Sequence, residues 1–244
     1  MIRDLFKNKL WVLSSAALLV VPIYTWRKLY KSYKEDKINY EREVLFHKRH
    51  NCVVLYSPRK GMSGWPPHLT RIKANIKDGM SVLIEPIVYF INTAIKSIDI
   101  AVMILTCEGI TNALIDASKR GIKVRILLNF EHAYNTSHLY RKMINEGVNI
   151  RFYVARHKEV SQSYSMMHYK YMLKDYCNTG GYVFMGSMNM SKSSFTNNFE
   201  DIVFTSTEYV VESVHENFEK CWQYVGEENK NDYNRTILLH SNLA

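Results

Sequence analysis

The chain lacks any pair of cysteines spaced as CxxC, since Cys52, Cys107, Cys177 and Cys221 are scattered along it. This pattern offers no disulfide framework and fits a reducing compartment. It also lacks an internal repeat. With 244 residues, of which 47% are hydrophobic, the chain is too apolar to stay disordered. We expect one sizeable globular domain with an appendage.

Acidic residues are outnumbered by basic ones, 23 against 32, which gives a formal net charge of +9. Such an excess is typical of proteins that bind a polyanion, either nucleic acid or an anionic membrane surface. It is equally typical of ordinary basic cytosolic proteins, because net charge alone says nothing about clustering.

The segment Leu10–Trp26 contains no charged residue and is flanked by lysines and arginines. Its length is at the short end of what spans a bilayer. Bulky residues follow the apolar run, so a retained anchor is favoured over a cleaved signal peptide. The heavier basic flank, after Trp26, predicts a cytosolic body. A buried core helix is the alternative for this segment.

From Ser81 onward, strand-like runs alternate with helical patterns, which predicts an α/β fold with a partly parallel sheet. Glycines that follow the helical patterns, such as Gly121 and Gly147, indicate where helices stop. Helices are expected over 87–95, 108–120, 136–146 and 209–225, and strands over 97–106, 122–130, 148–154, 166–173, 182–185 and 201–205. The strands over 166–173 and 182–185 should form a hairpin.

His168 and Lys170 lie two positions apart on a predicted strand, so both side chains should project from one face. A neutral imidazole is a competent nucleophile toward phosphorus, and an ammonium stabilises phosphoryl oxygens. Ser187 and Asn189 repeat this spacing on the next predicted strand and offer neutral hydrogen-bond donors. Together the four residues predict a phosphoryl-transfer site.

The positions His168, Lys170, Asp175, Gly186, Ser187 and Asn189 resemble the HxKxxxxD…GSxN pattern of the phospholipase D superfamily. Glu200 falls where that family often carries an acidic residue that orients the histidine. The resemblance implies a metal-independent phosphodiesterase with an α-β-α sandwich around a mixed sheet. Asp175 either takes part in the chemistry or holds the turn and the sheet.

The stretches 41–46, 121–129 and 197–204 look like the mitochondrial phospholipase D subgroup known as Zucchini, or mitochondrial cardiolipin hydrolase. The resemblance implies a homodimer on the mitochondrial outer membrane that cleaves RNA in piRNA biogenesis. It also implies the following division of the chain: flank 1–9, transmembrane anchor 10–26, linker 27–40, catalytic domain 41–228 and tail 229–244. The connection from Asp175 to Gly186 is longer than the family's usual one.

The subgroup's zinc-binding insertion uses several cysteines, whereas here only Cys52 lies near His47, His50 and His68. Their spacing matches no established zinc pattern. We therefore expect no metal and no other cofactor.

The two-histidine chemistry of the superfamily it resembles implies that this chain, with a single HxK motif, needs two copies to complete one active site. His168 of one copy would attack phosphorus and His168 of the other would protonate the leaving oxygen. Lys170 and Asn189 would bind the phosphoryl oxygens, and Arg59 and Lys60 could track the phosphates of single-stranded RNA. A cardiolipin or phospholipid hydrolase is the alternative, because its chemistry is identical. A non-catalytic membrane scaffold is a third interpretation.

Overall fold

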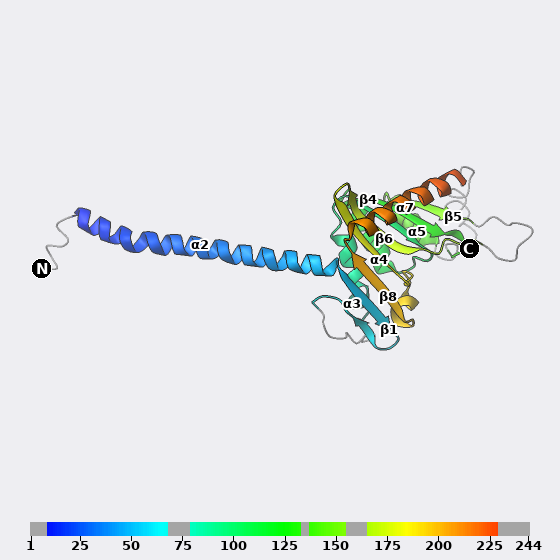
Figure 1. Ribbon diagram of the computed structural model, residues 1–244, viewed down its shortest axis with the longest axis horizontal. Coiled ribbons are helices and arrows are strands. Elements are labelled where there is room, and N and C mark those ends of the chain that lie inside the picture. The colour runs from blue at the N-terminus through cyan, green and yellow to red at the C-terminus, as the bar shows by residue number, and fades with distance from the viewer. Residues whose placement is uncertain (1–8, 68–78, 133–136, 155–164, 229–244) are drawn as a thin grey trace, which may run out of the picture. The chain divides into compact units, whose positions relative to one another are not determined.

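The computed structural model describes residues 9–67, 79–132, 137–154 and 165–228. The chain divides into two units, Met1–His47 and Lys48–Ala244. Helix α2 (Lys9–Arg49) accounts for the described part of the first unit and continues through Pro22 (Figure 1). The predicted anchor and linker therefore form one continuous helix.

Helix α2 does not confirm the predicted transmembrane anchor at residues 10–26. Among the described residues, no helix is both long and apolar enough to cross a membrane. Several large apolar side chains of this segment are exposed, including Leu18, Leu19 and Trp26. Further along the helix the residues are strongly charged, and Lys31 pairs with Glu35 one turn later at 3.9 Å.

An eight-stranded mixed sheet forms the centre of the second unit, in the order β2-β1-β8-β7-β6-β3-β4-β5. The strands are β1 (Cys52–Ser57), β2 (Gly61–Ser63), β3 (Ser97–Val102), β4 (Lys123–Asn129), β5 (Asn149–Tyr153), β6 (Lys170–Cys177), β7 (Gly180–Gly186) and β8 (Glu200–Thr205). Strands β3, β4 and β5 are parallel, as the alternating pattern predicts, and the other pairs are antiparallel. The mixed α/β sheet is thus confirmed.

Helices cover both faces of the sheet, because its inner strands are apolar on both sides. Ile126 and Leu128 of β4 join the core formed with the helices of one face, whereas Leu127 packs with Phe218 on the opposite face. The helices of the first face are α3 (Gly79–Asn92), α4 (Glu108–Lys119), α5 (Ser137–Asn145) and the short α6 (Lys192–Thr196). Helix α7 (Glu208–Glu228) crosses the other face (Figure 1). A single-turn 3-10 helix, Phe130–His132, follows β4.

Two details of the sheet differ from the sequence prediction. Strand β6 begins at Lys170 and ends at Cys177, four residues later at each end than predicted. The hairpin β1–β2 was not predicted at all. It lies at the edge of the sheet, where β1 pairs with β8. Side chains of β1 alternate between buried and exposed over only six residues, which is a weak pattern in the sequence.

Arg125 of β4 fastens α7 to the sheet. Its guanidinium donates to both oxygens of Asp99 at 2.6 and 2.8 Å and to Glu219 of α7 at 2.6 Å. These two carboxylates, with His215, are close enough together to resemble a metal site. The guanidinium of Arg125 hydrogen-bonds both carboxylates, so the cluster is accounted for by an ion-pair network.

Two of the candidate zinc ligands, Cys52 and His50, each contact other groups of the protein. The Cys52 thiol donates to the Arg49 carbonyl at 3.8 Å, and burial raises its pKa to about 11, which disfavours the thiolate that zinc needs. The His50 ring is buried against Tyr182, with 4.5 Å between ring centroids. His68 lies outside the described residues. The absence of zinc stays a prediction.

Candidate active site

His168 lies just before β6, at the edge of the sheet where β3 and β4 end. The backbone on both sides of it is held in place. The Met103 N–H donates to the Tyr169 carbonyl at 3.1 Å, which continues the pairing of β3 with β6. The Met167 N–H donates to the side-chain oxygen of Asn129, at the end of β4, also at 3.1 Å. The exposed imidazole therefore stands on a fixed segment of extended chain.

Lys170 lies beside the imidazole, as the two-residue spacing requires. Its Nζ is 3.2 Å from Nε2 and 3.3 Å from Nδ1 of His168, and it donates to the His168 carbonyl at 2.9 Å. Partial burial lowers the pKa of Lys170, and the charge of Glu200 opposes that shift. A cation thus stands within hydrogen-bond distance of a candidate nucleophile, which suits attack on an anionic phosphodiester.

Ser187 and Asn189 were predicted to lie on a strand. In the structure they follow the end of β7. The reason is Gly186, where an added Cβ would lie 2.0 Å from the Asp201 carbonyl oxygen of β8. Only glycine allows this close approach of the two backbones. The Ser187 N–H donates to the same carbonyl at 3.2 Å, so the chain turns away from the sheet at a fixed point.

The side chain of Asn189 has one buried atom without a hydrogen-bond partner among the described residues, its Oδ1. The next residue, Met190, is fixed by backbone bonds to Ile104 and Thr106, just beyond β3. An unmade bond at a buried polar atom is costly, and such atoms concentrate at functional sites. Because a side-chain amide can present either oxygen or nitrogen by rotation, this position can offer a donor to a phosphoryl oxygen.

Glu200, at the start of β8, contacts Ser187 rather than the histidine it was expected to orient. Its Oε2 accepts a short hydrogen bond from Ser187 Oγ, and its Oε1 accepts from Asn198 Nδ2 at 2.8 Å. Across the part of the chain that the structure describes, no hydrogen bond joins Glu200 to His168. The carboxylate therefore fixes the serine and adds negative charge near Lys170.

Asp175 lies away from this group and performs the structural role that the sequence left open. It is seven residues beyond His168, which along a strand corresponds to roughly 20 Å. Its carboxylate accepts from the backbone N–H groups of Ile95, Lys96 and Ser97, at distances from 2.7 to 3.2 Å. The aspartate ties the connection between α3 and β3 to β6, and a part in the chemistry stays a prediction.

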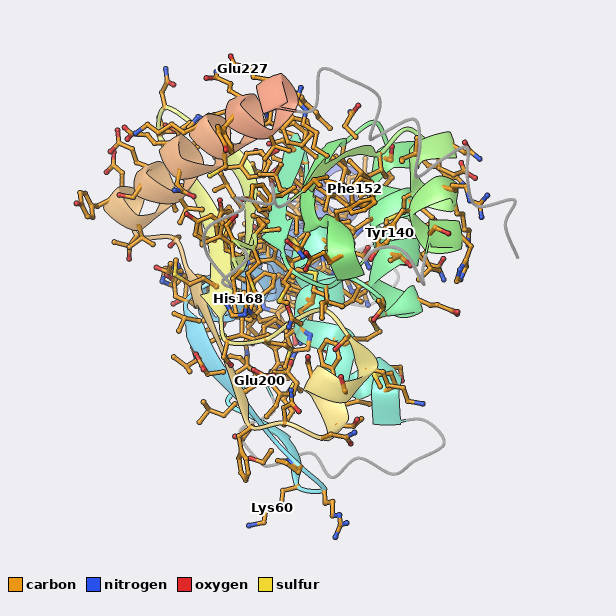
Figure 2. All side chains as sticks on the ribbon, turned by 90° about the vertical axis from the view of Figure 1, so that its right-hand side faces the viewer. Lys60, Tyr140, Phe152, His168, Glu200 and Glu227 are labelled. Carbon is orange, nitrogen blue, oxygen red and sulfur yellow. The ribbon has the colours of Figure 1, made fainter. Side chains whose placement is uncertain are left out.

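Arg59 and Lys60 are also not brought to the site. Both are exposed in the turn of the β1–β2 hairpin, where Arg59 has a positive φ of 59°. Figure 2 shows Lys60 at the tip of that hairpin, beyond Glu200 as seen from His168. Contact of Arg59 and Lys60 with a substrate stays a prediction.

Asn129 was not singled out in the sequence, although it holds the backbone next to His168. The residue is 2% exposed, and its Nδ2 is buried without a partner among the described residues. A polar residue directly after the apolar run of a predicted parallel strand was the available signal, because functional groups gather at that end of a strand. Nothing in the local spacing connects it to His168.

Comparison with known proteins places the chain in a family. The family model described as "Cardiolipin synthase, PLD-like domain" matches residues 87–222, more than half of the chain. A mitochondrial cardiolipin hydrolase of Xenopus tropicalis is 25% identical over 128 residues, which is 52% of this chain and 55% of that protein. Another, from Chlamydomonas reinhardtii, is 23% identical over 133 residues, 54% of each chain. The chain thus spans about half the length of these relatives.

Among solved structures, NucT from Helicobacter pylori superposes with a TM-score of 0.52 at 22% sequence identity. The match covers 61% of this chain and 92% of that one. At this identity the likeness concerns the fold alone.

Proposed function

Because the chain belongs to the family of phospholipase D-like domains, we propose that it is a phosphodiesterase that hydrolyses cardiolipin or a related anionic phospholipid. The observation that carries the proposal is the Lys170 ammonium 3.2 Å from the His168 imidazole, on a fixed and exposed segment. The substrate is supported by the relatives, which are named cardiolipin hydrolases. These names favour the lipid over the RNA that the sequence placed first.

In the proposed reaction a ring nitrogen of His168 attacks phosphorus, forming an N–P bond while one P–O ester bond breaks. The departing alcohol oxygen takes a proton from His168 of a second copy. Water then cleaves the phosphohistidine and leaves a phosphomonoester. Lys170 and Asn189 bind the non-bridging oxygens, and Ser187, held by Glu200, supports them. No step requires a metal ion.

Two further assignments accompany the substrate. The active unit is a homodimer, since the chain supplies a single HxK motif and the reaction uses two histidines. Association with mitochondria is supported by the names of the relatives. Placement on the outer membrane rests on the resemblance to the mitochondrial subgroup. A catalytic body in the cytosol is supported by the basic flank that follows the apolar segment of α2.

An endoribonuclease acting on single-stranded RNA, including piRNA precursors, is the second candidate. It is favoured by the net charge of +9 and by the exposed basic pair Arg59 and Lys60. The phosphodiester chemistry at His168 would be the same, so only a substrate comparison separates the two functions.

The test is incubation of the purified full chain with cardiolipin vesicles and, separately, with labelled single-stranded RNA, both in EDTA. We expect phosphatidic acid-type products from the vesicles, and no turnover by His168→Ala. His138→Ala serves as the matched control, because His138 is an exposed histidine of α5 that is not part of the HxK motif. Cleavage of RNA alone would reverse the choice of substrate, and activity retained by His168→Ala would overturn the catalytic assignment.

A further inference from the structure

An open pocket of about 330 Å³ lies between the first half of α7 and the start of β6. One wall is formed by Tyr169 and Tyr171, and α7 supplies the other. The α7 residues are Tyr209, Val210, Ser213, Val214 and Asn217. Its volume is at the lower end of the range of about 300 to 1,000 Å³ seen for small-molecule sites, so it could hold a segment of a ligand.

The polar atoms at the pocket's wall bond to one another. The Tyr171 hydroxyl donates to Asn217 Oδ1 at 3.1 Å, and Asn217 Nδ2 donates to the Tyr169 hydroxyl at 3.3 Å. Burial raises the pKa of Tyr171, which keeps its hydroxyl a donor. With these groups engaged, the tyrosines present mainly carbon to the pocket.

Among the described residues, no charged side chain lines this pocket. A phosphate or a sugar-phosphate backbone would lose hydration there without gaining a charged partner. A nucleobase would lose the partners of its polar edge, although its faces could stack on tyrosine. A hydrocarbon chain has no polar groups to desolvate, and its transfer from water into the pocket is favourable in free energy.

The pocket adjoins the catalytic segment through Tyr169, which stands between His168 and Lys170 in the chain. Because side chains alternate along extended chain, Tyr169 points to the α7 face while its two neighbours point to the other. The ring of Tyr169 lies 5.4 Å from that of Tyr171, and both line the pocket on the face opposite to the side chains of His168 and Lys170. His168 precedes the first residue of β6, so a molecule whose phosphorus meets His168 would reach the pocket by passing around the start of that strand.

We propose that this pocket binds an acyl chain of the phospholipid whose phosphodiester reacts at His168. The inference rests on the proposed function and adds to it the site that selects a lipid. Burying each methylene in an apolar pocket strengthens binding by up to roughly fourfold. The apparent KM should therefore fall as the acyl chains of the substrate lengthen, until the pocket is full.

The experiment measures kcat/KM for soluble short-chain phospholipids of increasing chain length, and for bis(4-nitrophenyl) phosphate, a diester without acyl chains. Ser213→Phe introduces a ring at the pocket wall. Glu212→Phe is the matched control, since Glu212 is exposed and does not line the pocket. The quantity compared is kcat/KM for the octanoyl substrate divided by kcat/KM for the chainless diester. We expect this ratio to fall at least tenfold in Ser213→Phe and to stay constant in Glu212→Phe.

The outcomes separate this inference from the proposed function. Hydrolysis of cardiolipin with no dependence on chain length, or with an unchanged ratio in Ser213→Phe, would overturn the pocket assignment alone. Hydrolysis of the chainless diester and of RNA, but of no lipid, would overturn both. A ratio that falls equally in both variants would show a general disturbance of α7 and would also count against the pocket.

Discussion

Asn129 acts on catalysis through the backbone, because its side-chain oxygen accepts from the N–H that precedes His168. Removing that acceptor in Asn129→Ala should let the histidine segment shift, and we expect kcat to fall by about tenfold to a hundredfold with little change in KM. Asn129→Asp keeps the acceptor and should recover most of the rate. The measurement is steady-state kinetics together with thermal unfolding. If kcat fell equally in both variants and thermal unfolding showed that both were destabilised, a positioning role for Asn129 would be contradicted.

At the scale of residues, the sequence predicted the groups that lie near one another in the chain. The pair His168 and Lys170 meets because two-residue spacing fixes it. The bonds of Asp175 and Glu200 could not be predicted, since their partners are set by tertiary structure. The carboxylate of Asp175 reaches backbone N–H groups some eighty residues earlier in the sequence, and Glu200 bonds Ser187 across adjoining strand ends.

Between elements, Lys174 of β6 joins the sheet to the end of α3. Its fully buried Nζ donates to Phe90 O at 3.2 Å and to Thr93 Oγ1 at 2.5 Å. Burial lowers its pKa from 10.5 to about 7, only partly opposed by Asp175. Between these two pH values the unfolded chain binds a proton that the folded chain does not, so stability rises with pH.

We therefore expect the free energy of unfolding to increase, relative to that of Lys174→Met, by up to about 1.4 kcal/mol per pH unit above neutrality. Below pH 7 the difference between the two proteins should be constant, because lysine is then protonated in both states. Denaturant titrations over this range provide the measurement. Lys192→Met, at an exposed position of α6, is the control. A flat difference would show that Lys174 does not titrate in the folded protein.

At the scale of elements, hydrophobic pattern and glycine stops predicted α4, α5 and the parallel strands well. They placed β6 four residues early because Met166 and Met167 are as apolar as the strand that follows. They missed β1 and β2, whose pairing depends on β8 at the other end of the chain. Local pattern cannot indicate such distant pairing.

For the whole molecule, the alternation of strands and helices predicted the layered α/β architecture, and the structure confirms it. The order of the strands could not be derived, because β8 and β7 insert between β1 and β6 through contacts far apart in sequence. The second copy of the chain was inferred only from the chemistry. The proposed reaction uses one histidine as nucleophile and another as acid, and each chain supplies a single HxK motif.

That requirement can be tested by mixing wild-type protein with His168→Ala and allowing the subunits to exchange. If each active site takes His168 from two copies, an equal mixture retains about a quarter of the wild-type activity, since only that fraction of random dimers is intact. Independent sites in single chains would retain half. Mixing with the active His138→Ala protein should leave activity unchanged, and sedimentation should show dimers at the assay concentration. A linear fall of activity with the wild-type fraction would show that one chain contains a complete site.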